Sequence, residues 1–318
     1  MLLDSSARLA DASALRARLD EDGYLFLRNL VDLELIHEIQ ELIAAELSRL
    51  DVIDPDVDRS VHRLPARKGV DLYAVLDGLS RQRLNAFARQ EALLSVFRRI
   101  FGEDPKPLDY AWPRAAGPGR CERPHCDWVY MCRGTRRLLS AWIPLMDLPV
   151  TSGPLMILEN SHIENTHTSA YLNTDVDRLG FFSGARLKHS ALARGGRYSE
   201  RPDKTREDFG TRWLTRDYLM GDIVIFSTRC LHATLDNQTA GFRASIDLRF
   251  QPKSEPADPR FDGENPVGHA HRNRTIFDYM PVSHARRILL SVRRAARKAA
   301  QLGGTPSSTN TVEPPIGE

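Results

Sequence analysis

The chain has 318 residues, of which 42% are hydrophobic and 27% charged, and its formal net charge is +2 at pH 7. This length is enough for a full core, so one catalytic domain with additional segments is expected. The small net charge argues against nucleic acid as the main partner. No apolar run approaches the roughly 20 residues that a membrane span needs, and the polar start does not resemble a signal peptide. The four cysteines include no Cys-x-x-Cys pair, so free thiols and a cytoplasmic location are expected.

The first fifty residues predict two helices around one short strand. Residues 1–20 are typical of a short helical lead-in, and residues 22–27 predict a turn followed by a strand. Asp32 is a suitable N-cap for a helix over 32–50, because the apolar residues there recur at helical spacing. We expect this helix to pack on the outside of a sheet.

A loop and a second amphipathic helix follow. Residues 51–70 contain prolines and charges without periodicity, which predicts a loop. Residues 91–101 repeat apolar side chains at helical spacing, and Gly102 is the expected stop of that helix. We expect this helix to lie outside the sheet as well.

From about residue 108 to 252, short apolar strands alternate with Pro and Gly, a pattern typical of a β-sandwich or barrel. The rhythm is lost between residues 163 and 210, and a long structureless insertion of this kind usually forms a lid or a binding loop. Between Arg178 and Arg206 the insertion contains eight Lys or Arg residues and two acids. It is therefore expected to attract anions; alternatively, these side chains only solvate an exposed loop.

The C-terminal part is expected to lie outside the barrel. The Pro-rich, charged segment after Phe250 predicts an excursion from it, within a single catalytic domain over residues 1–282. Residues 283–303 predict a basic amphipathic helix, which usually packs on its own domain and alternatively binds a membrane or an acidic partner. Residues 304–318 are rich in Pro, Ser and Thr, which predicts disorder.

The strongest chemical signal is the segment Arg123-Pro124-His125-Cys126-Asp127. On a β-strand, His125 and Asp127 would point to the same face. A second histidine from another strand would complete a 2-His-1-carboxylate facial triad, which leaves one face of an octahedral metal ion open. Our candidate is His232, which follows an apolar, β-branched run. The alternative is a strand-edge histidine and a turn aspartate without a metal.

Further motifs stand in a fixed order around this triad. Arg243 lies eleven residues after His232 in an alternating, strand-like segment. The strand Ser140-Ala141-Trp142-Ile143-Pro144-Leu145 comes between the first two ligands and the third, as does Gly153-Pro154-Leu155-Met156-Ile157-Leu158, which leads to Ser161-His162. Over residues 120–250, the chain resembles the phytanoyl-CoA dioxygenase family of iron(II)/2-oxoglutarate oxygenases.

The resemblance implies a mainly β fold with flanking helices, built on a double-stranded β-helix core of the jelly-roll, cupin-like kind. It also implies iron(II) held by His125, Asp127 and His232, with 2-oxoglutarate as cosubstrate and O2 as oxidant. Neutral imidazoles and one carboxylate suit iron(II). A protein shell with a single negative charge leaves room for a dianionic cosubstrate to chelate the metal.

Four residues are candidates for binding the cosubstrate. Arg243 has the guanidinium fork suited to the far carboxylate of 2-oxoglutarate; alternatively it is a surface residue of its strand, as Arg249 could be. Thr234 would share a face with His232 and donate its hydroxyl to the same carboxylate. By resemblance, Trp142 lies on a strand lining the cosubstrate, although core packing is an equal alternative. Arg114 resembles the basic residue of the preceding strand in the family.

The chain departs from the family at Glu159-Asn160-Ser161-His162, where the family has Pro-Gly-Ser-His. This makes the turn geometry there an open point and leaves the metal site unaffected. We expect His162 to be a turn residue and not a fourth ligand. Cys126 should point to the opposite face from its neighbours and be a buried thiol.

The expected function is hydroxylation, or another oxidation, of a small-molecule substrate with release of succinate and CO2. The basic insertion favours an anionic substrate, expected to come from secondary metabolism. Halogenases of this superfamily replace the carboxylate ligand by a small residue, so the presence of Asp127 argues against halogenation. Two rivals stay open: a cupin-type metal isomerase or hydrolase without cosubstrate, and a non-catalytic barrel that only binds a ligand. The oligomeric state is open too.

Overall fold

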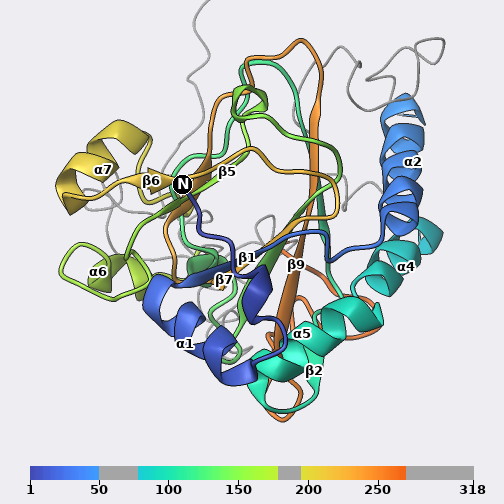
Figure 1. Ribbon diagram of the computed structural model, residues 1–318, viewed down its shortest axis with the longest axis horizontal. Coiled ribbons are helices and arrows are strands. Elements are labelled where there is room, and N and C mark those ends of the chain that lie inside the picture. The colour runs from blue at the N-terminus through green and yellow to red at the C-terminus, as the bar shows by residue number, and fades with distance from the viewer. Residues whose placement is uncertain (50–77, 178–194, 270–318) are drawn as a thin grey trace, which may run out of the picture. The chain divides into compact units, whose positions relative to one another are not determined.

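The computed structural model describes residues 1–49, 78–177 and 195–269, and the strands of this part form two antiparallel sheets (Figure 1). The large sheet consists of β1 (Tyr24–Leu27), β2 (Pro105–Pro107), β3 (Trp112–Ala116), β4 (Leu139–Pro144), β7 (Ile223–Ser227) and β9 (Arg243–Pro252). Its order is β1-β7-β4-β9-β2, and β3 also pairs with β9. The small sheet has the order β6-β5-β8, with β5 (Leu155–Leu158), β6 (Trp213–Leu214) and β8 (His232–Thr234). The predicted mainly β fold with a double-stranded β-helix core is confirmed.

Strand β9 makes the most pairings in the large sheet, since β2, β3 and β4 all pair with it. All ten of its residues are buried. The side chains alternate as a strand requires: the even-numbered residues from Ala244 to Phe250 join the hydrophobic core, whereas the odd-numbered residues from Arg243 to Arg249 line a pocket. One face of β9 therefore stabilises the fold, and the other carries polar groups.

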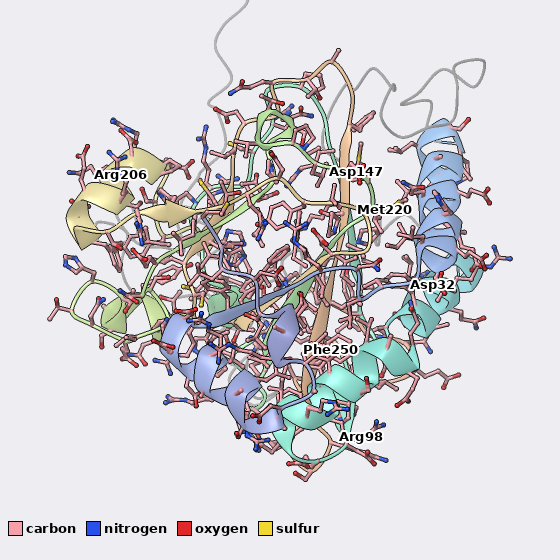
Figure 2. All side chains as sticks on the ribbon, viewed as in Figure 1. Asp32, Arg98, Asp147, Arg206, Met220 and Phe250 are labelled. Carbon is pink, nitrogen blue, oxygen red and sulfur yellow. The ribbon has the colours of Figure 1, made fainter. Side chains whose placement is uncertain are left out.

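Helices cover the outside of the large sheet, as predicted. They are α1 (Ala12–Asp22), α2 (Leu33–Arg49), α4 (Gly78–Phe87) and α5 (Glu91–Phe101), preceded by the 3-10 turn η1 (Ser6–Arg8). Helix α5 packs its apolar face on β9, where the ring of Phe97 stacks on Phe250 at 3.8 Å between centroids. Such a contact excludes water from the outer face of the sheet. Figure 2 labels Phe250. Helix α4 was not predicted.

The predicted helix ends are confirmed. The Asp32 side chain accepts a hydrogen bond from the backbone N–H of Glu34 at 2.8 Å, so it satisfies a donor that the first turn of α2 leaves free. Gly102 ends α5 in the left-handed conformation, at φ +74°, and its N–H donates to the carbonyl of Arg98. A side chain at this φ would be strained, which is why a glycine ends this helix.

The insertion at residues 163–210 was predicted to lack structure, and this is wrong for the part described. It contains α6 (Ser169–Leu172) and α7 (Pro202–Phe209). The 3-10 turn η4 (Val150–Ser152) precedes β5 and is not part of the insertion. Tyr171 and Leu172 of α6 belong to a second hydrophobic cluster. Apolar residues of the insertion therefore form a small core with Cys126, Trp128 and Val129. Without helical or strand periodicity in the insertion, the sequence did not predict this core.

The prediction that the segment after β9 leaves the barrel is also wrong. Arg260 is 3% exposed and its guanidinium donates to Asp258 at 2.6 Å, to Asp177 and to the carbonyl of Tyr130 at 2.9 Å. Phe261 is fully buried. Paired charges can be buried when each finds hydrogen-bond partners, so the charged composition did not mean exposure.

Several predictions concern residues outside the described part. These are the loop at 51–70, most of the basic middle of the insertion, the helix at 283–303 and the tail at 304–318. The division of the chain into domains therefore stays a prediction. Among the described helices, none is both long and apolar enough to cross a membrane.

Candidate active site

The two histidines of the predicted triad lie side by side at the edge of the small sheet. His125 and His232 form an antiparallel bridge, with backbone N–H groups donating in both directions at 3.0 and 2.9 Å. His232 opens β8, which pairs with β5. The segment with His125 thus extends the small sheet by one bridge, and this places two imidazoles from distant parts of the sequence side by side, with ring centroids 4.2 Å apart.

Asp127 does not lie on a strand, contrary to the prediction. It is the first residue of a 3-10 turn, η3 (Asp127–Tyr130), whose Trp128 and Val129 are buried in the second hydrophobic cluster. A turn lets both of these adjacent residues enter the same cluster, whereas a strand would point them to opposite faces. His125 and Asp127 nevertheless converge, because the chain turns around the metal position.

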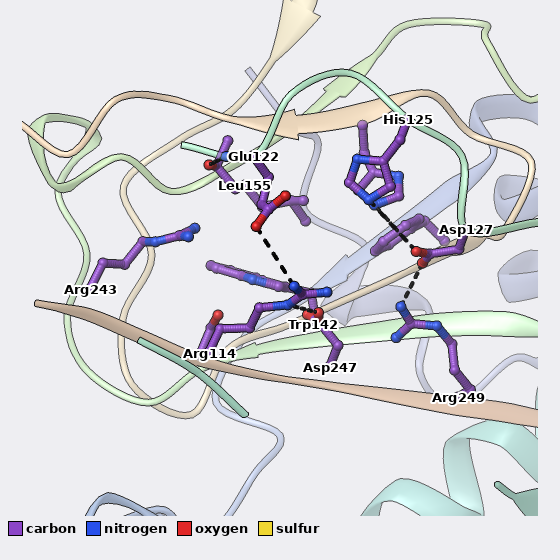
Figure 3. Close-up of a pocket in the computed structure, with 13 residues that line it drawn as sticks. Arg114, Glu122, His125, Asp127, Trp142, Leu155, Arg243, Asp247 and Arg249 are labelled. Carbon is purple, nitrogen blue, oxygen red and sulfur yellow. Dashed lines mark hydrogen bonds and ion pairs between the residues drawn. The ribbon is translucent and has the colours of Figure 1, made fainter. Parts of the chain in front are cut away.

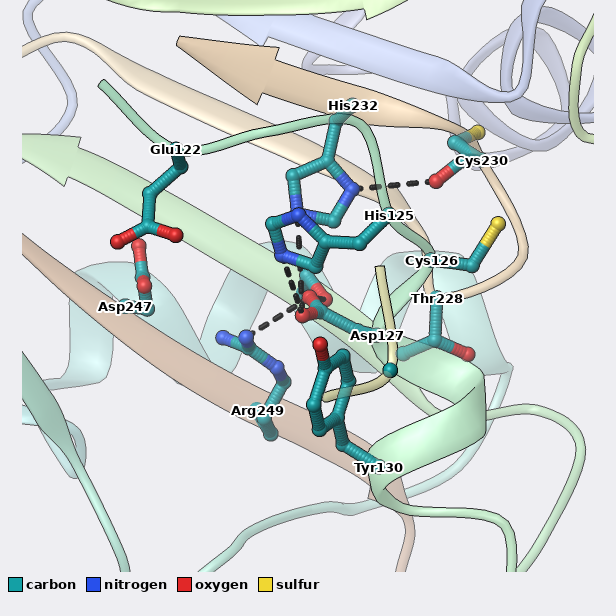
Figure 4. Close-up of polar contacts among 12 residues, drawn as sticks. Glu122, His125, Cys126, Asp127, Tyr130, Thr228, Cys230, His232, Asp247 and Arg249 are labelled. Atoms are coloured by element: carbon teal, nitrogen blue, oxygen red, sulfur yellow. Dashed lines mark hydrogen bonds and ion pairs between the residues drawn. The ribbon is translucent and has the colours of Figure 1, made fainter. Parts of the chain in front are cut away.

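Figure 4 shows the three side chains meeting at one point. Asp127 Oδ1 lies 3.8 Å from His125 Nε2 and 3.7 Å from His232 Nε2. One ligand atom from each of the three residues lies within 4.8 Å of the others, and all three residues are buried. This is the geometry of a 2-His-1-carboxylate metal site. Within the described part of the chain, no other His, Cys, Asp and Glu side chains converge in this way.

Backbone carbonyls orient both imidazoles. His125 Nδ1 lies 2.7 Å from the carbonyl oxygen of Arg123, and His232 Nδ1 lies 3.1 Å from that of Cys230. When Nδ1 carries the proton and donates it to a carbonyl, Nε2 keeps its lone pair for a metal. Burial, with the nearby His125, lowers the pKa of His232 to about 4. This imidazole is therefore neutral at neutral pH, as a metal ligand must be.

Two side chains of the large sheet contact the Asp127 carboxylate. Arg249 pairs with Asp127 Oδ2 at 2.7 Å, and Ser140 Oγ donates to the same oxygen at 2.5 Å. Burial alone would raise the pKa of Asp127, but the charge of Arg249 and the neighbouring histidines outweigh it and lower that pKa. The carboxylate is therefore ionised. Arg249, considered above as a surface residue, is 3% exposed and belongs to the site.

All seven predicted site residues line one pocket (Figure 3). It encloses about 360 Å³ of space, part of which is open to solvent. The predicted residues are Arg114, His125, Asp127, Trp142, His232, Thr234 and Arg243. They come from β3, β4, β8, β9 and the segment that ends in η3. Their roles toward a metal or a cosubstrate remain proposals.

Arg243 is buried in the pocket with part of its guanidinium unsatisfied. It is 2% exposed, and its Nε and Nη1 have no hydrogen-bond partner. Burial lowers the pKa of Arg243 to about 10, with Glu122 and Asp247 acting in the opposite direction. The side chain is therefore charged at neutral pH. A buried cation with unpaired donors is costly unless a ligand supplies the acceptors, so this pocket fits an anion.

Arg114 differs from Arg243 because its charge is already engaged. Its Nε donates to Asp247 Oδ2 at 2.7 Å, and its Nη1 lies 3.8 Å from Glu122 Oε1. Although burial works against it, these two carboxylates raise the pKa of Arg114. Arg114 therefore shapes the wall of the pocket and has less free capacity for an anion than Arg243.

Thr234 and Trp142 lie on opposite sheets of the pocket. Thr234 Oγ1 accepts a hydrogen bond from the backbone N–H of Glu122 at 2.8 Å, and its own hydroxyl proton remains to be donated. Trp142 lines the pocket and also packs edge-on against Tyr218, with ring centroids 4.8 Å apart. Trp142 therefore both packs in the core and forms part of the pocket wall.

Sequence reasoning missed several polar residues of the site: Glu122, Ser140, Ser245, Asp247 and Arg249. A signal was present for three of them. In β9, Arg243, Ser245, Asp247 and Arg249 alternate with Ala244, Ile246, Leu248 and Phe250. Once Arg243 was assigned inward, period-2 alternation would have assigned the other three odd-numbered residues inward too.

The departure from the family turn is accommodated by Asn160. This residue adopts φ +61°, a left-handed conformation that asparagine tolerates better than most residues other than glycine. His162 packs over Gly23, with Nε2 3.1 Å from the carbonyl oxygen of Asp20, away from the triad. It is a structural residue, as predicted. Cys126 is fully buried, and its Sγ lies 3.1 Å from the carbonyl oxygen of Arg229.

Tyr171 of α6 hydrogen-bonds both to Cys126, between the two candidate ligands, and to Gly196 near the end of the insertion. Its hydroxyl accepts from the backbone N–H of Cys126 at 3.0 Å and donates to the carbonyl of Gly196 at 2.7 Å. Tyr130 of η3 donates to the neighbouring carbonyl of Gly195 at 2.9 Å. The described residues that flank positions 178–194 are thereby held against the segment between His125 and Asp127.

We expect Tyr171→Phe to lower the free energy of unfolding by about 1–3 kcal/mol, because it leaves a buried backbone N–H without its partner. The loss would be measured by urea denaturation. Tyr24→Phe is the matched control, since its hydroxyl accepts only from the N–H of Leu3, which lies at the surface and can bond to water instead. Equal losses in the two variants would contradict a special role for Tyr171.

Comparison with known proteins identifies the family. Residues 19–245 match the family model described as phytanoyl-CoA dioxygenase. A 1-deoxypentalenic acid 11-beta-hydroxylase from Streptomyces exfoliatus is 27% identical over 265 residues, which cover 79% of this chain and 85% of the relative. The counterpart from Streptomyces arenae is 26% identical over 263 residues, with the same coverage.

Solved structures share the fold. The non-heme alpha ketoglutarate dependent epimerase SnoN from nogalamycin biosynthesis has a TM-score of 0.52 at 17% identity, covering 81% of this chain and 92% of that chain. The carbocyclase SnoK from the same biosynthesis has a TM-score of 0.51 at 15% identity, covering 85% and 90%. The family match spans most of the sequence and confirms the resemblance. The protein therefore belongs to the phytanoyl-CoA dioxygenase family of iron(II)/2-oxoglutarate-dependent oxygenases.

Proposed function

We propose that this oxygenase holds iron(II) with His125 Nε2, His232 Nε2 and Asp127 Oδ1, and binds 2-oxoglutarate between the metal and Arg243. The observation that carries the proposal is the presence, in one pocket, of a converging metal-ligand set and a buried guanidinium with unpaired donors. A cosubstrate with a carboxylate at each end would satisfy both, since one end chelates a metal and the other meets a cation.

The chain's own residues would then bind and orient the cosubstrate. The Arg243 guanidinium donates to the far carboxylate, and the Thr234 hydroxyl adds a donor to the same group. Trp142 supplies an apolar wall. Bound iron(II) supplies the oxidative chemistry, which couples decarboxylation of 2-oxoglutarate to oxidation of the substrate. Two of the three proposed metal ligands are histidines, so Asp127 provides the single negative charge of the protein shell.

The charge of the pocket supports a ligand pair that is neutral overall. Three arginines (Arg114, Arg243, Arg249) and three acids (Glu122, Asp127, Asp247) line it. A divalent cation and a dianionic cosubstrate together add no net charge to this balance. Binding either one alone would leave a net charge in a buried site, which is costly, so we expect the metal and 2-oxoglutarate to favour each other's binding.

For the substrate, we propose a small molecule with a carboxylate or another anionic group, from secondary metabolism. The two Streptomyces relatives are named for an acid, 1-deoxypentalenic acid, and for its hydroxylation. The basic middle of the insertion, residues 178–206, is consistent with an anionic substrate, although Arg197, Arg201 and Lys204 already pair with acids of the insertion. Hydroxylation is the preferred outcome. A cytoplasmic location stays a prediction.

The two rival functions are not favoured. A metal isomerase or hydrolase without cosubstrate gives no reason for a second, cationic end of the pocket opposite the metal ligands. A non-catalytic barrel gives no reason for a complete triad with both imidazoles oriented by carbonyls. Family membership and the hydroxylase relatives point to an enzyme as well.

A succinate-release assay would test the proposal. The purified chain is supplied with iron(II), ascorbate and 2-oxoglutarate, and with 1-deoxypentalenic acid and other small carboxylic acids, each paired with its methyl ester. We expect an acid to accelerate succinate release and its ester to do so at least tenfold less, because the ester lacks the charge for a charge-assisted hydrogen bond, which contributes about 1.5–3 kcal/mol. Equal acceleration by acid and ester would overturn the anionic substrate. Failure of 2-oxoglutarate to bind in the presence of metal would overturn the proposed function.

A further inference from the structure

Asp127 is held by two side chains that are themselves partners in the large sheet. Ser140 of β4 and Arg249 of β9 lie directly opposite each other in the register of these strands. Both side chains contact the same atom, Asp127 Oδ2, at 2.5 and 2.7 Å. The contacts leave Oδ1 as the oxygen that faces the two histidines.

The two side chains that contact Asp127 are packed inside the sheet, although Nε of Arg249 has no hydrogen-bond partner. Strands β4 and β9 are paired over six residues, and Ser140 and Arg249 are 0% and 3% exposed. The guanidinium of Arg249 also lies over the ring of Trp112, 5.0 Å from its centroid, and its Nη1 donates to the carbonyl of Leu248 at 2.9 Å. A side chain with this many contacts cannot easily follow a moving carboxylate.

We propose that Arg249, with Ser140, is a positioning residue that makes Asp127 bind the metal through Oδ1 alone. The inference rests on the proposed metal site. A carboxylate that offered both oxygens would occupy two coordination positions, and a facial triad must leave three positions open for cosubstrate and O2. Occupying Oδ2 with two strong hydrogen bonds prevents this. Ser140 and Arg249 thus keep the open face of the site open.

Two effects of Arg249 on metal affinity oppose each other. Its positive charge repels a cation, so its removal would tighten metal binding if charge were its main effect. Its hydrogen bond orients the ligand, and loss of such an outer contact typically weakens metal binding 10–100-fold. Affinity alone therefore does not decide the proposal, and the deciding measurement is the coordination of the bound metal.

The experiment compares the full-length wild type with Arg249→Gln, Arg249→Lys and Ser140→Ala. Mn(II) and Co(II) are titrated by calorimetry, and the Co(II) d–d absorption spectrum reports the coordination number. We expect Arg249→Gln to change the Co(II) spectrum, because the freed Oδ2 becomes available to the metal. Ser140→Ala should show a smaller change of the same kind, and Arg249→Lys should fall between wild type and Arg249→Gln. The Mn(II) titrations check that each variant still binds metal.

Lys106→Gln serves as a control for loss of an ion pair next to β9 that lies away from the pocket. Lys106 pairs with Asp262 at 2.6 Å, opposite Gln251 of β9. It should bind both metals as wild type does. If Arg249→Gln does not fold, Arg249→Lys and Ser140→Ala still decide the matter.

An unchanged Co(II) spectrum in folded variants that bind the metal would overturn the positioning role. Absence of metal binding in the wild type would instead overturn the proposed metal site. The two failures are therefore distinguishable.

Discussion

Asp127→Ala is expected to release no succinate above background, even at saturating iron(II) and 2-oxoglutarate. The substitution removes the only anionic ligand of the proposed site and leaves two imidazoles, of which the His232 ring is neutral at neutral pH. Two histidines alone do not form the facial triad. Calorimetric titration with Mn(II) should show no binding at the site, and succinate would be measured by chromatography.

Two further variants make this result interpretable. Asp127→Ala leaves Arg249 buried without its carboxylate, and breaking a buried pair costs about 3–5 kcal/mol of stability. Asp127→Asn keeps the size and the contact surface of the side chain, so it should fold better and still bind metal poorly. Asp104→Ala removes an exposed carboxylate paired with Arg98 and should behave as wild type. Turnover that is undiminished in both Asp127 variants would refute the metal assignment.

Arg243→Ala should raise the 2-oxoglutarate concentration required for half-maximal turnover ten- to hundredfold. The variant removes a charge-assisted contact whose hydrogen bonds are worth about 1.5–3 kcal/mol each. Arg243 is the pocket arginine with buried, unpaired Nε and Nη1 groups on the cosubstrate side, whereas Arg114 is engaged by Asp247 and Glu122. The rate at saturating 2-oxoglutarate should change much less, because Arg243 does not contact the metal ligands.

Arg243→Lys is the matched variant, since it keeps the charge and loses the planar fork. It should require more 2-oxoglutarate than wild type and less than Arg243→Ala, because a single ammonium cannot make the bidentate contact. Binding of 2-oxoglutarate to the Mn(II)-loaded protein should follow the same order by calorimetry. If both variants titrate with 2-oxoglutarate as wild type does, the far carboxylate is bound elsewhere.

The sequence by itself was sufficient for the family, the fold class and four of the side chains that line the pocket, His125, Asp127, His232 and Arg243. His125, Asp127, His232 and Arg243 are polar residues in or beside apolar, strand-like segments, a position that polar side chains occupy only with partners. Their order along the chain matches one family, and helical or strand periodicity located α2, α5 and the strand-rich core. These are local signals, which can be read from a single sequence.

Contacts between distant segments could not be predicted in this way. That Asp127 begins a 3-10 turn depends on the burial of Trp128 and Val129 against α6, more than forty residues away. That Arg249 belongs to the site depends on the register that places it opposite Ser140. The burial of Arg260 depends on acids from two separate segments. The exposure of a charged side chain is decided by the partners that the fold brings to it, and only the tertiary structure specifies those partners.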